Sequence, residues 1–85
     1  MTTKDIILKY LKHRMAEGVS VVSSIHIELN LPEYGRLYWN TRKLPSAYSR
    51  VWRKIRENHE YKEIGIKELI EIKNENLTKI WQIKM

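Results

Sequence analysis

The sequence predicts a small α+β domain in which three helices are followed by a β-hairpin. Two observations predict this class. Apolar residues recur at helical spacing as far as His59, and from Ile64 onward they recur at every second position. The 85 residues include no cysteine and no low-complexity tract, so we expect a single domain, residues 1–85, with one small hydrophobic core.

The first helix is expected over residues 3–17. Its apolar face consists of Ile7, Leu8, Leu11 and Met15. Thr2 or Thr3 can cap its amino-terminal end, and Gly18 suits the left-handed conformation that ends many helices. Residues 19–22 are short and β-branched, which favours a brief strand.

A short second helix is expected over residues 23–31, capped by Ser23 or Ser24 and ending before Pro32. On this interpretation the apolar face consists of Val21, Val22, Ile25 and Leu29. The same segment also alternates as a strand would, so both alternatives stay open. Residues 32–44 are expected to form an ordered but irregular connection, because Gly35 and Pro45 punctuate it.

The clearest helix is expected over residues 46–59. A buried stripe is predicted from the spacing of Tyr48, Val51, Trp52, Ile55 and His59. The opposite arc carries Ser49, Arg50, Arg53, Lys54, Arg56 and Glu57. Residues 36–56 contain seven Lys and Arg and no acid, which leaves nine bases against ten acids in the rest of the chain. The positive charge is therefore local, as is typical of a nucleic-acid-binding element.

A β-hairpin is expected from residue 64 to the end of the chain. Apolar residues alternate with polar ones at Ile66, Ile70 and Ile72, and again at Trp81, Ile83 and Met85. The tip is expected near residues 74–77, between Lys73 and Lys79.

This order of elements, together with residues 46–58, resembles the winged helix-turn-helix family. The shared pattern is a small hydroxyl residue, a spaced apolar stripe and interleaved arginines. The resemblance implies that the third helix enters the major groove of DNA and that the hairpin is a wing on the flanking backbone. It also implies that Ile25, Leu29 and Leu31 are core positions of the second helix. The chain departs from the family in its long connection and in Asn58–His59, where the family often has Gly.

The resemblance also suggests a division of roles among the polar side chains. Base edges would be contacted by Ser46, Ser49, Arg50 and Arg53. Backbone phosphates would be contacted by Arg36, Arg42, Lys43, Lys54, Arg56, Lys73 and Lys79. An arginine fork matches guanine O6 and N7, and arginine also suits phosphate. The alternative is that these cations are ordinary solvated charges.

We therefore expect sequence-specific binding of double-stranded DNA, as a small transcriptional regulator or as the origin-binding module of a replication initiator. A homodimer on paired half-sites is compatible with this expectation. The alternative is a protein-interaction module that uses exposed Tyr34, Tyr38 and Trp39. RNA binding would require aromatic residues exposed among the basic ones, whereas Tyr48 and Trp52 are predicted to be buried.

No pattern in the sequence indicates catalysis, so we expect a protein that is not an enzyme. Three acids, Glu57, Glu60 and Glu63, have no nucleophile to pair with, and His13, His26 and His59 lack the spacing of metal ligands. We expect no metal, no cofactor and no small-molecule ligand. A secretory signal and a membrane-spanning run are absent from the sequence, which favours a cytoplasmic, nucleoid-associated location and no membrane partner.

Overall fold

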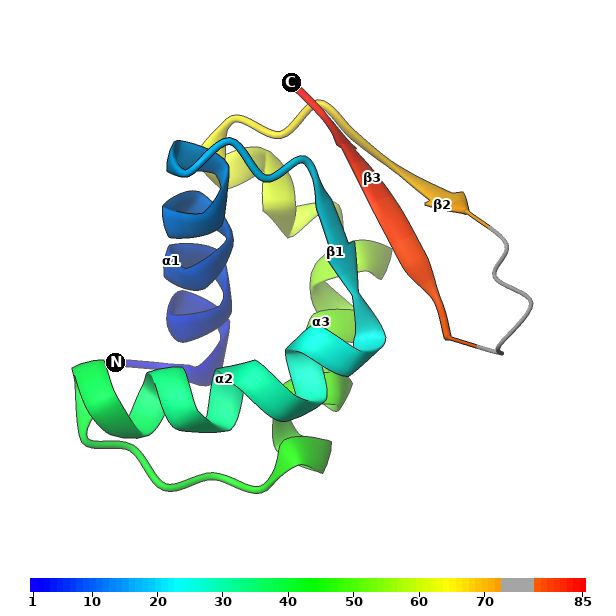
Figure 1. Ribbon diagram of the computed structural model, residues 1–85. Coiled ribbons are helices and arrows are strands. Elements are labelled where there is room, and N and C mark those ends of the chain that lie inside the picture. The colour runs from blue at the N-terminus through cyan, green and yellow to red at the C-terminus, as the bar shows by residue number, and fades with distance from the viewer. Residues whose placement is uncertain (73–77) are drawn as a thin grey trace.

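The computed structural model describes residues 1–72 and 78–85, in which three helices pack beside a three-stranded antiparallel sheet (Figure 1). The elements follow in the order α1 (Thr3–Ala16), β1 (Val21–Ser23), α2 (Ser24–Trp39), α3 (Pro45–Glu57), a 3-10 helix η1 (Glu60–Ile64), β2 (Glu68–Ile72) and β3 (Ile80–Lys84). The predicted small α+β domain is confirmed at this level. The 3-10 helix was not predicted.

Helix α1 begins at a capping box. The Asp5 backbone N–H donates to Thr2 Oγ1 at 3.2 Å, and the Thr2 backbone N–H donates to the Asp5 carboxylate at 3.1 Å. The predicted extent is confirmed to within one residue, and Gly18 follows with φ +88°. The buried face is wider than predicted, because it consists of Ile6, Ile7, Leu8, Tyr10 and Leu11, whereas Met15 is only partly buried.

The predicted end of the second helix before Pro32 is wrong. Helix α2 continues through Pro32 to Trp39, so residues 32–39 are not the irregular connection that was expected. A proline inside a helix removes one backbone hydrogen bond and costs about 3 kcal/mol. Beyond the proline, Gly35 is buried against α3 and Trp39 packs against the core. These contacts require the helix to continue, and they outweigh the local preference to stop.

The predicted apolar face of α2 is also wrong. The buried positions are Ile27, Leu31 and Gly35, whereas Ile25 is 45% exposed and Leu29 is 67% exposed. Ser23 ends β1 and caps α2, since its hydroxyl accepts from the His26 N–H at 3.2 Å. This start agrees with the predicted cap. The face differs because Val21 and Val22, which were counted on the helical face, lie in β1. Of the three core positions implied by the family resemblance, Leu31 alone is buried.

Helices α2 and α3 are joined by residues 40–44, so the predicted long connection is absent. Asn40 takes the left-handed conformation with φ 48° and ends α2, and Pro45 occupies the first turn of α3, where its missing N–H does no harm. Helix α3 ends at Glu57, two residues before its predicted end. His59 was predicted to be buried but is exposed. Its φ of 54° is in the left-handed region, a conformation that Gly often supplies after a helix.

The sheet has the strand order β1-β3-β2, with every pair antiparallel. The predicted pairing of the two C-terminal strands is confirmed, with Ile70 opposite Gln82. The predicted brief strand is also confirmed, and its pairing with β3, Val22 opposite Trp81, is a new finding. Ile70 and Ile72 are exposed, because the core-facing side of β2 is the one that carries Leu69. The predicted tip and Lys73 lie outside the described residues.

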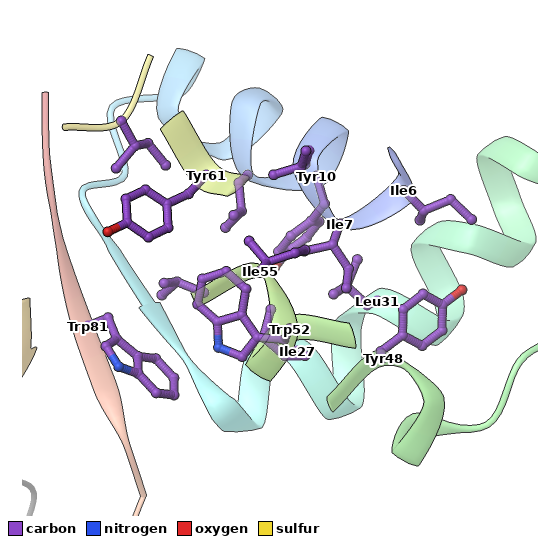
Figure 2. Close-up of a cluster of buried hydrophobic side chains, with 14 of the residues drawn as sticks. Ile6, Ile7, Tyr10, Ile27, Leu31, Tyr48, Trp52, Ile55, Tyr61 and Trp81 are labelled. Atoms are coloured by element: carbon purple, nitrogen blue, oxygen red, sulfur yellow. The ribbon is translucent and has the colours of Figure 1, made fainter. Parts of the chain in front are cut away.

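Helix α3 lies at the centre of the core. Figure 2 shows Trp52 of α3 beside Trp81 of β3. Their ring centroids are 5.5 Å apart, and the rings meet edge-to-face. Tyr48 and Ile55 of the same helix are fully buried. The prediction that Tyr48, Trp52 and Trp81 are core residues is therefore confirmed. This packing turns the opposite face of α3 toward solvent.

Candidate nucleic-acid interface

Helix α3 separates its residues into an apolar face and a cationic face. Tyr48 and Ile55 are 0% exposed and Trp52 is 2% exposed. Ser46, Arg50, Arg53 and Lys54 are all exposed on the other side. Helical periodicity alone produces this separation, because the stripe at i, i+4 and i+7 leaves the intervening residues outside. Three of the four side chains predicted to lie near base edges, Ser46, Arg50 and Arg53, are therefore exposed on the helix that fills the core, and Ser49 is half-buried.

A groove lined by hydroxyl and charged residues lies on this exposed face, with a volume of about 620 Å3. Its lining consists of Ser46, Ser49, Arg50, Arg53, Lys54, Arg56 and Glu57. All four predicted base-contacting residues and two of the predicted phosphate-contacting residues therefore share one surface. Four of the seven lining side chains are cationic and one is acidic, so the groove is complementary to a negatively charged ligand.

Two arginines of this surface, Arg50 and Arg53, are available for a ligand. Arg50 makes no ion pair with any residue within 1–72 or 78–85. Arg53 Nε lies 3.4 Å from Glu57 Oε1, but both side chains are largely exposed, at 74% and 65%. Exposed pairs of this kind contribute only about 0.2–1 kcal/mol, so a phosphate or a guanine can replace Glu57 at little cost.

Ser49 is less free than its predicted role suggests. Its hydroxyl donates to Glu28 Oε1 at 3.0 Å, which links α3 to α2. The hydroxyl oxygen can still accept a hydrogen bond from a ligand. Ser46, one turn earlier, is exposed.

Arg56 was predicted to contact phosphate, but it packs against the core. Its guanidinium carbon lies 4.4 Å from the centre of the Trp81 ring and 5.7 Å from that of Trp52. Burial lowers the pKa of Arg56, and no protein atom in the described residues pairs with its Nε. A cation over an aromatic face is stabilised by the ring quadrupole. The contact joins α3 to β3 and leaves less of Arg56 available to a ligand.

The remaining predicted phosphate contacts lie around α3. Arg42 and Lys43 are exposed in the short connection that leads into it. Arg36 is on α2, where its Nη2 lies 3.6 Å from Glu33 Oε1. Lys79 is exposed just before β3, and its backbone carbonyl accepts from the Ser24 N–H at 2.9 Å, which places it beside the start of α2.

The aromatic surface proposed for the protein-interaction alternative is smaller than expected. Tyr38 is 63% exposed, but Tyr34 and Trp39 are partly buried and pack against the core. Burial also raises the pKa of the Tyr34 phenol. The ring of Tyr34 packs edge-to-face on Tyr10 with centroids 5.3 Å apart, and at a tilt on Tyr38 with centroids 4.8 Å apart. These rings mainly fasten α2 to α1.

Three contacts near the site could not be inferred from the sequence. They are the Arg56–Trp81 stack, the Ser49–Glu28 hydrogen bond and the close approach of Gly35 to Tyr48. Each joins residues from different elements, and no local spacing signals it. The sequence contains one partial indication, for Arg56: it follows Trp52 by four residues, so it lies at the border of the apolar stripe.

Within the described ranges, no group of three or more His, Asp or Glu side chains is arranged to hold a metal ion, and no helix has the length and apolar content needed to cross a membrane. Comparison of the chain with protein-family models, with curated proteins and with solved structures gave no match.

Proposed function

We propose that this domain binds double-stranded DNA with α3 in the major groove. The observation that carries the proposal is the cationic face of α3, which is exposed while the opposite face of the helix fills the core. An α-helix fits the major groove, and arginine is the side chain best suited to guanine and to phosphate. The winged-helix interpretation is supported by the packing of α1 and α2 against α3, followed by an antiparallel strand pair.

In this arrangement Arg50 and Arg53 reach base edges, together with the accepting oxygens of Ser46 and Ser49. Lys54, on the same face, binds a flanking phosphate, and Arg42 and Lys43 bind phosphates from the connection that leads into α3. Lys79 extends the positive surface toward the start of α2. The proposed biological roles are a small transcriptional regulator or the origin-binding module of a replication initiator.

Selection of bound duplexes from a random pool tests the proposal directly. An enriched motif is expected, and inverted repeats within it would identify binding by a symmetric dimer. With about six phosphate contacts, the logarithm of the association constant should fall with the logarithm of salt concentration at a slope of about −5. A flat salt response, or a pool that shows no enrichment, contradicts the proposal.

Two pairs of substitutions separate base recognition from phosphate binding. Replacing Arg50 and Arg53 with Gln should remove about 1–3 kcal/mol of discrimination per base pair contacted and so abolish the selected motif. Replacing Arg42 and Lys43 with Gln should weaken all duplexes alike and reduce the salt slope by about two. Lys12→Gln, an exposed charge on α1, is the matched control and should change neither quantity.

A further inference from the structure

A second groove, distinct from the cationic face of α3, lies between α2 and the connection to α3. It has a volume of about 420 Å3. Its apolar lining comes from Leu29, Pro32 and Leu44, and its basic rim comes from Arg36, Arg42 and Lys43. The α2 residues of this set recur at i, i+3 and i+7, so they form one helical stripe that faces the connection.

Two leucines of the groove are displayed to solvent. Leu29 is 67% exposed and Leu44 is 74% exposed, although they come from different elements and line the same hollow. Neither belongs to the hydrophobic core. An apolar side chain that enters the groove would cover both leucines, and removal of this surface from water favours binding.

The charges around the hollow are unbalanced. The lining contains three cations and one acid, Glu33, whose carboxylate lies 3.6 Å from Arg36. Arg42 and Lys43 make no ion pair within the described parts of the chain. The positive end of α3 also opens beside the groove, because the cap residue Leu44 offers no side-chain hydrogen bond and the first turn contains no acid. A ligand that fits this surface is negatively charged.

From these two properties we infer that the groove binds an acidic segment of a partner protein that carries one large apolar side chain. The apolar residue would lie between Leu29 and Leu44, and flanking carboxylates would meet Arg42, Lys43 and the start of α3. Nucleic acid can meet Arg42 and Lys43 on the rim, but it fits the apolar part of the groove less well. A phosphate backbone has nothing to bury against two leucines, and the lining has no aromatic ring on which a base could stack. This interaction surface goes beyond DNA binding.

An NMR titration without DNA tests the inference. The probe is a synthetic peptide of about twelve residues, with a central Leu flanked on both sides by Glu and Asp. The methyl signals of Leu29 and Leu44 should move on binding. A second peptide with Ser in place of the central Leu should bind at least about tenfold more weakly, because the buried apolar group is lost.

Matched variants identify the site. Leu29→Gln should weaken binding of the first peptide about tenfold or more, whereas Leu37→Gln should leave it unchanged. Leu37 is an equally suitable position, since it lies on α2, is 62% exposed and does not line the groove. Both side chains are outside the core, so both variants should fold. Replacing Arg42 and Lys43 with Gln should weaken binding several-fold and flatten its salt dependence.

Several results would overturn the inference. They are the absence of binding at millimolar peptide, equal affinity for the Ser peptide, and equal loss in Leu29→Gln and Leu37→Gln. Self-association of the protein that disappears in Leu29→Gln would instead identify a second copy as the occupant. If duplex DNA, but not the peptide, shifted the methyl signals of both leucines, DNA would be identified as the occupant of the groove. Since the peptide titration contains no DNA, its outcome does not depend on the proposed DNA binding.

Discussion

Gly35→Ala should lower the free energy of unfolding in the wild-type protein but raise it in the Tyr48→Phe protein. Helix α2 crosses α3 at Gly35, and a Cβ added there would overlap the Tyr48 hydroxyl oxygen. The next nearest atom is Tyr48 Cζ at 3.5 Å, an ordinary van der Waals distance. The clash therefore rests on a single oxygen atom. That hydroxyl is buried and has no hydrogen-bond partner among the described residues.

The magnitudes follow from two opposing effects. Forcing an extra methyl into a packed contact costs about 1–3 kcal/mol. Alanine in a helix interior is more favourable than glycine by about 1 kcal/mol. Gly35→Ala alone should thus lower the free energy of unfolding by up to about 2 kcal/mol. In the Tyr48→Phe protein the overlap is gone, and the same change should raise the free energy of unfolding by up to about 1 kcal/mol.

Tyr48→Phe alone should be neutral or stabilising, because it removes a hydroxyl that is buried without a partner. Urea unfolding of the four proteins, followed by the fluorescence of the buried Trp52 and Trp81, gives the coupling free energy, which should be about 1–3 kcal/mol. Gly18→Ala is the control. Gly18 has φ +88° and no atom within 4 Å of an added Cβ, so its cost should be the same in both backgrounds. Equal effects of Gly35→Ala in the two backgrounds would refute this account of the α2–α3 contact.

Three further substitutions test other parts of the fold. Thr2→Ala should cost about 1 kcal/mol at pH 7 in urea unfolding. Hydrogen bonds from Thr2 lower the pKa of Asp5. The contribution of this carboxylate to the free energy of unfolding is therefore complete above its unfolded pKa of about 3.9, and it is lost as the pH falls through the lower folded value. A destabilisation by Thr2→Ala that did not shrink in acid would contradict this. Arg56→Gln should destabilise the protein by about 1–2 kcal/mol. The double variant Arg56→Gln with Trp81→Leu should lose less stability than the two single variants lose in sum, as a double-mutant cycle would show. Leu44→Asp should raise the free energy of unfolding by about 1 kcal/mol, because Leu44 precedes α3 and offers no side-chain cap, whereas Asp can cap the helix. An unchanged urea midpoint would show that Asp does not cap α3 at this position.

The sequence predicted α3 well because its stripe of large apolar side chains has one consistent period, and burial of Tyr48, Trp52 and Ile55 follows that period. Helix α2 was predicted poorly, since local preferences oppose the tertiary structure there. Pro32 and Gly35 are signals of a helix end, yet both lie inside the helix. Gly35 is needed for close approach to α3, which is information about a distant part of the chain.

The candidate site shows the same limit. Arg50 and Arg53 could be assigned to the exposed face by counting residues from the apolar stripe. Arg56 lies at the border of that stripe, where a small rotation of the helix decides between solvent and core. Its position depends on Trp81, which comes from the last strand and can be placed only when the sheet is known. Local periodicity therefore predicts the centre of a helix face better than its edges.

The positive field over α3 persists because the acids near it are already occupied. Glu28 accepts a hydrogen bond across the α2–α3 contact, and Glu57 is paired on its own helix. Beyond the end of α3, Lys4 Nζ lies 2.8 Å from Glu60 and 2.7 Å from Glu63, and these hydrogen bonds raise the pKa of Lys4. Glu57 competes only weakly, because its exposed pair with Arg53 can be replaced by a ligand, and the other three acids are not paired with Arg50 or Arg53. The contacts that fasten α3 to its neighbours also keep that face available to an anionic ligand, which is why stability and binding should be separable by mutation at opposite sides of one helix.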